Sequence, residues 1–345
     1  MDNAIASSNL GIEHAANFRR LWPVCALLLL LALVPVISTL IGAPFLIRVF
    51  TRVITFAIAA VALNLVVGFG GLISMLHAGL FGIGAYVVGI LAQHDFNNEL
   101  LFHFLPGTSD LAIALPAAFI ITMLASAIFG IISLRTSGAY FIMITLAFNQ
   151  MLYYFFVSLQ KYGGDDGLQV LSATTIAGFD STSRIPFYYI CLAILTFTLL
   201  FVSRLVESRF GLVLRASSQN ERRVIAIGIS PLRYKLVAFM ISGAIAGLAG
   251  GLWTNGQQFV SPADMSWIRS GDFVLMAVLG GTSFVAGPVV GAAAFLLIEF
   301  TFALWTTYWQ LPFGLLIVFV VVALKHGLVG AGRDALAKLR WKQHG

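Results

Sequence analysis

Long apolar segments alternate with short polar segments along almost the whole chain. Most of the apolar segments reach or approach the roughly 20 residues that a helix needs to cross the hydrocarbon core of a bilayer. We expect an all-α fold, a polytopic membrane helix bundle at 22–325, between a polar segment at 1–21 and a basic tail at 326–345. The pattern predicts about ten transmembrane helices, at residues 22–42, 50–67, 74–93, 111–134, 140–159, 186–202, 236–254, 272–286, 288–308 and 311–324.

Basic residues are unevenly distributed among the polar segments. The loop after the third predicted helix contains no Lys or Arg, whereas the stretch 204–235 and the C-terminal tail are basic. Loops rich in Lys and Arg stay on the cytoplasmic side of a membrane. We therefore expect both termini and the 204–235 stretch to be cytoplasmic. This orientation leaves four arginines outside, Arg48, Arg52, Arg184 and Arg269.

The stretch 204–235 is a polar island between two strongly apolar segments. Within it, Ser218 and Glu221 have the S-x-x-E spacing of a capping box, which satisfies free amides at a helix start. Gly228 supplies a left-handed C-terminal stop. The pattern predicts a short helix at 219–227, which is too short to be stable alone in water. It is either part of a solvated loop or a helix that lies against another surface.

Composition indicates that lipid solvates much of the chain. Apolar residues make up 59% and charged residues 10% of the 345 residues, against about 25% charged residues in soluble domains. The net charge is +6, but the basic residues lie beside the apolar segments, which is typical of membrane orientation rather than of nucleic-acid binding. Cys25 and Cys191 lie within apolar segments, so we expect no disulfide.

Small residues mark several predicted helices. Gly243, Gly247 and Gly251 are four residues apart, a spacing that lets two helix backbones approach closely. Two further stretches, 68–86 and 279–292, are interrupted by glycines. Broken helices in two halves of a transporter point to a solute path at membrane depth. We expect helix packing at the first set and a path near the two broken stretches.

Polar side chains inside the predicted helices are costly and therefore informative. Asn64, His77 and Asn149 are candidates for the path, although a lone histidine in a helix is also a common packing group. Glu299 is the only acidic residue well inside a predicted helix. It is either a proton or cation relay or one half of a hydrogen bond between helices.

Motifs for metal, hydrolytic or nucleotide chemistry are absent from the sequence. It contains no H-E-x-x-H, no G-x-S-x-G and no G-x-x-x-x-G-K-[ST]. We expect no metal, no cofactor and no catalytic residue. Ser74 and His77 would need a third group to form a hydrolase site. If ATP drives this protein, another chain must bind it.

Several blocks together resemble one known family. They are ALNLVVGFGGLISMLHAGLFGIGAY, LRTSGAYFIMITLAFNQM, YGGDDGL, SSQNERRVIAIGISPLRYKLVAFMISGAIAGLAGGL and VLGGTSFVAGPVVGA, in that order. They are similar to the second, M-type permease subunit of bacterial ABC transporters for branched-chain amino acids.

The resemblance implies partners and roles. The chain would pair with a second, similar permease subunit, two ABC ATPase subunits and a periplasmic solute-binding protein, in the bacterial inner membrane. It would form the path and would not itself be an enzyme. The resemblance identifies the short helix of the polar island as the coupling helix that docks on an ATPase. The residues implied there are Ser218, Asn220, Glu221, Arg222, Arg223, Ala226 and Gly228.

Other functions stay open on the sequence. Permeases for urea or short amides share the same blocks. A proton-coupled secondary transporter would use Glu299 and would need no ATPase. An intramembrane hydrolase would use Ser74 and His77. Co-isolation with an ATPase distinguishes the first class from the second.

Overall fold

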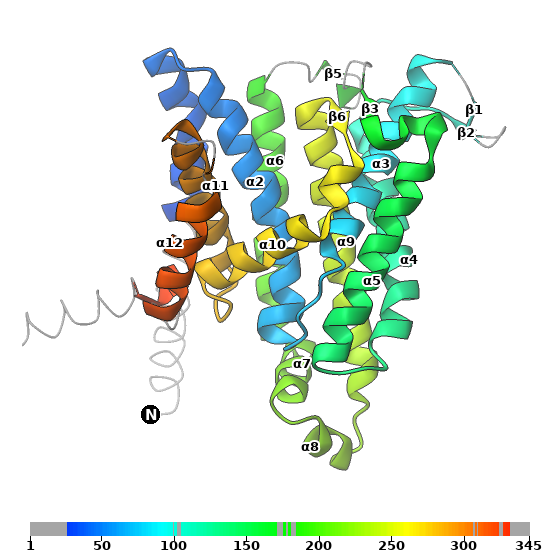
Figure 1. The fold of residues 1–345 in the computed structure, drawn as a ribbon, viewed down its shortest axis with the longest axis vertical. Helices are drawn as coiled ribbons and strands as arrows, with labels where there is room; N and C mark the ends of the chain where they lie inside the picture. Colours follow the sequence, from blue (N-terminus) through cyan, green and yellow to red (C-terminus); the bar gives the residue numbers. More distant parts are fainter. Residues whose placement is uncertain are drawn as a thin grey trace, which may run out of the picture.

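The computed structural model describes residues 26–98, 100–101, 105–170, 175–176, 179–180, 184–305, 308, 310–323 and 327–331. The N-terminal segment and the basic side chains of the C-terminal tail lie outside these residues. The described part is a bundle of helices (Figure 1). After a helix at Ala26–Ile41, its longer helices are α2 Phe45–Asn64, α3 His77–Phe96, α4 Leu111–Ser133, α5 Ala139–Ser158, α6 Arg184–Glu207, α9 Pro231–Gln257, α11 Gly287–Trp305 and α12 Gln310–Ala323.

Shorter elements connect the long helices. The short helices are α7 Arg209–Gln219, α8 Glu221–Ala226 and α10 Trp267–Gly280, with single turns η1 Leu65–Phe69, η2 Gln160–Tyr162, η3 Gly164–Asp166 and η4 Pro262–Met265. Three antiparallel pairs of two-residue strands lie near one end of the bundle: β1 Leu100–Leu101 with β2 Leu105–Pro106, β3 Leu168–Gln169 with β6 Phe259–Val260, and β4 Thr175–Ile176 with β5 Phe179–Asp180.

Six of the described helices are long and apolar enough to cross a membrane. The structure therefore confirms a helical, multi-pass membrane protein. The helix α10 differs from the prediction of a span at 272–286. It begins at Trp267, ends after 14 residues at Gly280 and lies across the bundle rather than along it (Figure 1). Residue 281 has a φ of +107°, which only glycine adopts readily, so the apolar run stops being helical there.

Local sequence accounts for several helix ends. The Asp110 carboxylate accepts from the backbone N–H of Ala112 at 2.9 Å, which caps α4. Pro231 is the first residue of α9, where its missing N–H costs nothing. Gly138 has a φ of +61° and makes the turn between α4 and α5.

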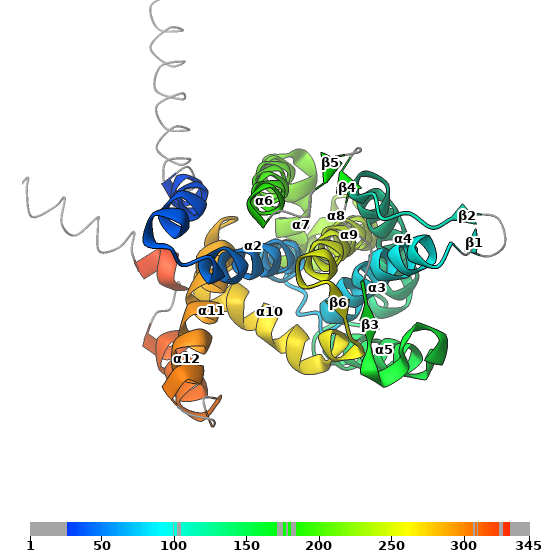
Figure 2. The same ribbon diagram turned by 90° about the horizontal axis from the view of Figure 1, so that it is seen from above.

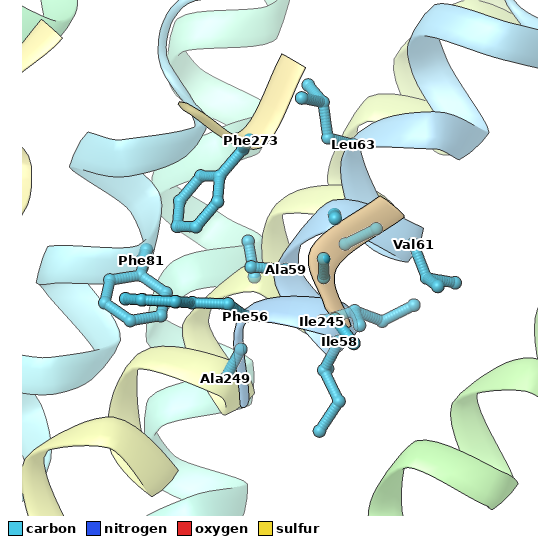
Figure 3. Close-up of a cluster of buried hydrophobic side chains, with 14 of the residues drawn as sticks. Phe56, Ile58, Ala59, Val61, Leu63, Phe81, Ile245, Ala249 and Phe273 are labelled. Carbon is cyan, nitrogen blue, oxygen red and sulfur yellow. The ribbon is translucent and has the colours of Figure 1, made fainter. Parts of the chain in front are cut away.

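The centre of the bundle is formed by α2 and α9, with α3 beside them (Figure 2). The most apolar window of α2 is 83% buried, whereas that of α5 is 28% buried. Aromatic side chains pack between these central helices: Phe56 of α2 lies 6.0 Å from Phe81 of α3 and 5.7 Å from Phe273 of α10, measured between ring centroids (Figure 3). We infer that α2 is a central helix and that α5 presents most of its surface to lipid or to another subunit.

Glycines allow the central helices to touch through their backbones. A Cβ on Gly250 of α9 would overlap the carbonyl oxygen of Phe81 in α3. The three predicted packing glycines, Gly243, Gly247 and Gly251, also lie in contacts of α9 with α3 and α4. Lipid provides no hydrophobic force between helices, so such close van der Waals packing contributes much of their association.

Candidate functional site

Both glycine-interrupted stretches are broken in the structure, as the sequence predicts. The first lies between α2 and α3: one π-helical turn ends at Phe69, and the chain is non-helical through residues 70–76. This segment runs from the end of the bundle near α7 to the start of α3 at His77 (Figure 1). The second break covers residues 281–286, between α10 and α11.

The two breaks meet at Asn64, the last residue of α2. The side-chain amide of Asn64 donates from Nδ2 to the carbonyl oxygen of Phe284, at 3.2 Å. A Cβ on Gly68 would overlap the carbonyl oxygen of Thr282. The Oδ1 atom of Asn64 is buried and accepts no hydrogen bond from the residues that the structure describes. A free polar acceptor therefore lies where the two irregular segments come together.

The side chain of His77 is fully hydrogen-bonded. Its Nε2 lies 2.8 Å from the Ser242 hydroxyl, and its Nδ1 lies 3.1 Å from the Ser74 hydroxyl. Because Ser242 donates to the backbone carbonyl of Ala62, it accepts from Nε2, and the Ser74 hydroxyl then donates to Nδ1. His77 is thus neutral, and its hydrogen bond to Ser242 joins α3 to α9. Ser242 in turn is hydrogen-bonded to α2. Among the described residues, no acidic side chain is hydrogen-bonded to His77 or Ser74 to complete a hydrolase site.

The start of α3 is buried, and side chains from other helices cap it. Asn149 of α5 accepts from the Gly79 N–H at 2.7 Å and donates to the Met265 carbonyl at 2.8 Å. The Ser270 hydroxyl of α10 accepts from the Ala78 N–H at 3.1 Å. The first amides of a helix have no partner within it. Asn149 and Ser270 therefore satisfy amides that would be costly to leave unpaired in a membrane.

Three hydroxyls in this network were not among the predicted site residues: Ser242, Ser270 and Thr145, which accepts from the Met75 N–H at 3.1 Å. All three are buried. Their signal in the sequence is weak, because small hydroxyl side chains inside membrane helices are also common packing residues. Only the fold shows that they surround one helix start.

The polar island forms two short helices, α7 and α8, at one end of the bundle (Figure 1). The predicted capping box of Ser218 with Glu221 is wrong. Ser218 lies in the last turn of α7 and donates to the carbonyl of Arg215 at 2.8 Å. Asn220 is the cap of α8, since its side chain accepts from the Arg223 N–H at 3.1 Å. The extended backbone of Asn220 separates the two helices. Ser218 therefore belongs to the end of α7 and cannot cap the start of α8.

The helix α8 is fixed at both ends. Glu221 in its first turn pairs with Lys235 of α9 at 2.8 Å. Gly228 follows its C-terminal end with a φ of +81°, in agreement with the predicted left-handed stop. Val224 is buried, and the other side chains of the predicted coupling helix are exposed: Glu221, Arg222, Arg223, Ile225, Ala226 and Ile227.

The end of α7 touches the first helix break. Gly71 is the second residue of the non-helical segment and has a φ of +68°. A Cβ on Gly71 would lie 2.9 Å from the Cβ of Ser218. The end of α7 therefore packs against the segment that leads to α3.

A second set of charged residues, from α2, η4, α10 and α11, forms ion pairs with one another. Arg52 of α2 pairs with Glu299 of α11 at 2.9 Å. Arg269 of α10 lies 3.6 Å from Asp264 and 3.5 Å from Asp272. For Glu299 the structure supports the hydrogen bond between helices, because its carboxylate is paired with a guanidinium rather than free.

Asp264 belongs to η4, in the loop between α9 and α10, and is held by several donors. The Trp253 indole N–H donates to its carboxylate at 3.0 Å. Burial raises the pKa of Asp264, and the Arg269 guanidinium acts in the opposite direction. Within the described ranges, no group of three or more His, Cys, Asp or Glu side chains has the arrangement of a metal site.

Long apolar helices around two linked helix breaks are features of multi-pass membrane transporters. Residues 45–322 match the family described as "Branched-chain amino acid transport system / permease component". The chain belongs to this family.

Two curated relatives carry the name "High-affinity branched-chain amino acid transport system permease protein LivM", one from Salmonella typhimurium and one from Escherichia coli. Each is 26% identical to this chain over 310 residues, which is 83% of this chain and 70% of the relative. A "Probable branched-chain amino acid transport permease protein LivM" from Methanocaldococcus jannaschii is 26% identical over 245 residues, 69% of this chain and 71% of the relative. No solved structure matches the chain.

Proposed function

We propose that this chain is the M-type permease subunit of a bacterial ABC importer for branched-chain amino acids. Its family and the names of its relatives support the substrate class and the permease role. The observation that carries the mechanism is the contact of Gly71 with Ser218. It joins the exposed helices α7 and α8, at one end of the bundle, to a helix break inside the bundle. In this proposal the chain hydrolyses no ATP; two separate ABC ATPase subunits supply the energy.

The exposed surface of α8 is suited to dock on an ATPase. Ile225 and Ile227 are 57% and 72% exposed beside Arg222 and Arg223. An apolar pair next to two guanidinium groups is a combination that protein interfaces favour. The Glu221–Lys235 ion pair ties this surface to α9, so a push on α8 reaches both α9 and, through α7, the 70–76 segment.

We place the second permease subunit, and the path, against the side of the bundle that carries α10 and the 70–76 segment (Figure 1). Irregular backbone at membrane depth is tolerated only where protein covers it or water lines it. Ile73 of the segment is 42% exposed, and Trp267 and Ile268 of α10 are 54% and 59% exposed. A similar permease subunit would cover this side and leave a mostly apolar path near Asn64, where leucine, isoleucine and valine side chains fit.

The orientation of the chain in the membrane follows from the proposal that α8 docks on a cytoplasmic ATPase. The α7–α8 end is cytoplasmic, both termini are cytoplasmic, and the end with the short strands faces the periplasm and its solute-binding protein. The protein acts in the bacterial inner membrane.

Purification of the tagged chain from its native membrane tests this proposal. We expect an ABC ATPase pair and a second permease subunit to be isolated with it. Uptake of labelled leucine by cells should then be inhibited by unlabelled isoleucine and valine but not by urea or acetamide. Isolation without any ATPase contradicts the importer, whereas inhibition by urea or acetamide contradicts only the substrate class.

A further inference from the structure

A recess of about 400 Å³, counting the open solvent at its mouth, lies between α2, α6 and α9. The three helices are neighbours in both views (Figures 1 and 2), and the helix ends that contribute the lining residues are at the end of the bundle opposite α8. Its wall includes the first turns of α2 and α6 and the last turns of α9. Neither the coupling surface nor the proposed path uses it.

The wall of the recess is strongly basic. Arg48, Arg52 and Arg184 all line it, and none of the lining residues in the described part of the chain is acidic. Arg52 pairs with Glu299, which lies outside the recess. Arg48 and Arg184 are exposed and have no ion pair with any residue that the structure describes. At least two guanidinium charges at this site are therefore not neutralised by described side chains.

Two further features make the recess attractive to an anion. The Nε atom of Arg52 is buried and donates to no acceptor among the described residues. The N-terminal ends of α2 and α6 carry partial positive charge, about half an elementary charge each, against about half a negative charge at the C-terminal end of α9. The two unpaired guanidinium charges of Arg48 and Arg184 add to the positive helix ends and outweigh the negative one, so the potential of the recess is positive.

The chemistry of the wall discriminates between possible anions. Arginine forms two parallel hydrogen bonds to a phosphate or a carboxylate. A free amino acid would also bring an ammonium group, and no carboxylate among the described residues lines the recess to receive it. Apolar side chains form the rest of the wall, among them Ile47, Phe187 and Leu252. Basic groups beside apolar ones at an end of a membrane bundle suit a lipid headgroup and the start of its acyl chains.

We propose that this recess binds the phosphodiester of an anionic phospholipid. The arginines bind the phosphate oxygens, and the first methylene groups of the acyl chains pack against the apolar wall. In the orientation proposed above, lipid binding accounts for arginines at the end of the bundle where the positive-inside rule disfavours them. It does not depend on which end is cytoplasmic, because headgroups are present at both membrane surfaces.

The test uses the purified transporter complex in detergent and a double variant, Arg48→Gln with Arg184→Gln. Both side chains are exposed, so we expect the variant to fold. Phosphatidylglycerol retention is measured by native mass spectrometry across a titration of the lipid. We expect the double variant to bind about 30-fold more weakly, the factor expected for loss of two charges near an anionic headgroup. Arg135→Gln, an exposed arginine after α4, is the matched control and should bind as the unmodified complex does.

Three arms distinguish the source of the anion. Thermal unfolding is followed with phosphatidylglycerol, with phosphatidylcholine and with inorganic phosphate at equal concentration. We expect stabilisation by phosphatidylglycerol alone, and its loss in the double variant. Equal stabilisation by inorganic phosphate would show a free-anion site and overturn the lipid proposal. Unchanged lipid retention in the double variant would overturn the site itself.

Discussion

Gly71 and Ser218 are 147 residues apart in the sequence and lie against each other in the fold, with 2.9 Å between the Ser218 Cβ and the position of a Cβ on Gly71. Gly71 also has a left-handed backbone. The contact joins the end of α7 to the segment that leads into α3. We infer that movement of α7 and α8 changes the position of this segment and so opens or closes the proposed solute path.

Substitution of Gly71 tests this link. Gly71→Ala should uncouple leucine-stimulated ATP hydrolysis from uptake, because the new methyl group pushes Ser218 and α7 away. Gly138→Ala is the control: residue 138 also has a positive φ, but a Cβ there meets nothing within 4 Å. Both variants place an alanine at a positive φ, which strains the backbone by about 1–3 kcal/mol.

Only Gly71→Ala should lose coupling, measured as the ratio of leucine transported to ATP hydrolysed in proteoliposomes. Ser218→Gly, which removes the opposing Cβ, should restore part of the coupling in the Gly71→Ala background. Equal coupling in the two alanine variants would mean that the contact carries no force.

The Glu221–Lys235 ion pair should hold α8 in position. Glu221→Lys places two like charges together and should reduce recovery of the ATPase with the permease, whereas the charge-swapped pair Glu221→Lys with Lys235→Glu should restore it. Pull-down of the ATPase measures the effect. The pair is partly exposed, so its loss should cost about 1 kcal/mol or less of stability. A swapped pair as defective as the single variant would show that Glu221 contacts the ATPase directly.

The caps of α3 should contribute to stability. Asn149→Ala leaves the Gly79 N–H and the Met265 carbonyl without partners, and we expect a loss of about 1–3 kcal/mol, measured by thermal unfolding in detergent. Ser158→Ala removes an exposed hydrogen bond within α5 and should change the stability by less than about 0.5 kcal/mol. Similar unfolding temperatures for both variants would contradict the capping role.

Because α3 and α9 approach closely at Gly250, we expect any side chain at this position to lower the stability of the bundle. Gly250→Ala should destabilise the bundle by about 1–3 kcal/mol, because its methyl group overlaps the Phe81 carbonyl. Gly271→Ala in α10 is the control, since a Cβ there meets nothing within 4 Å. The same unfolding assay compares them, and a Gly250→Ala protein as stable as Gly271→Ala would show that the two helices separate easily.

Substitution of Glu299 distinguishes the ATP-driven importer from a proton-coupled transporter. Glu299→Gln keeps one hydrogen bond to Arg52 but removes the negative charge. If Glu299 only forms an ion pair between helices, we expect the variant to be less stable and to retain most of its leucine uptake. A proton relay requires loss of uptake at every pH. Leucine uptake measured from pH 6 to pH 8 distinguishes these outcomes.

The hydrophobic pattern predicted most helices because lipid demands long apolar segments with satisfied backbones. It failed at α10, since the composition of an apolar run does not say whether it crosses the membrane or lies across a bundle. The breaks near Gly71 and Gly281 were visible because glycine tolerates positive φ.

The candidate site was harder to predict than the fold. The cap of α8 was misassigned, because Ser218 and Asn220 are both good capping residues and only the fold shows where α7 ends. The partners of Asn149 and Glu299 were hidden, since Arg52 and Glu299 are 247 residues apart. Such pairs follow from helix packing, which one sequence does not reveal.

The central claim is that a separate ATPase drives this permease through α8 and α7. The most direct measurement is uptake of labelled leucine into proteoliposomes that contain this chain and its partner permease, with solute-binding protein outside and ATP inside, with and without the ATPase subunits. We predict concentrative uptake only when the ATPase subunits are present. Concentrative uptake without them, driven by an imposed proton gradient, would contradict the account.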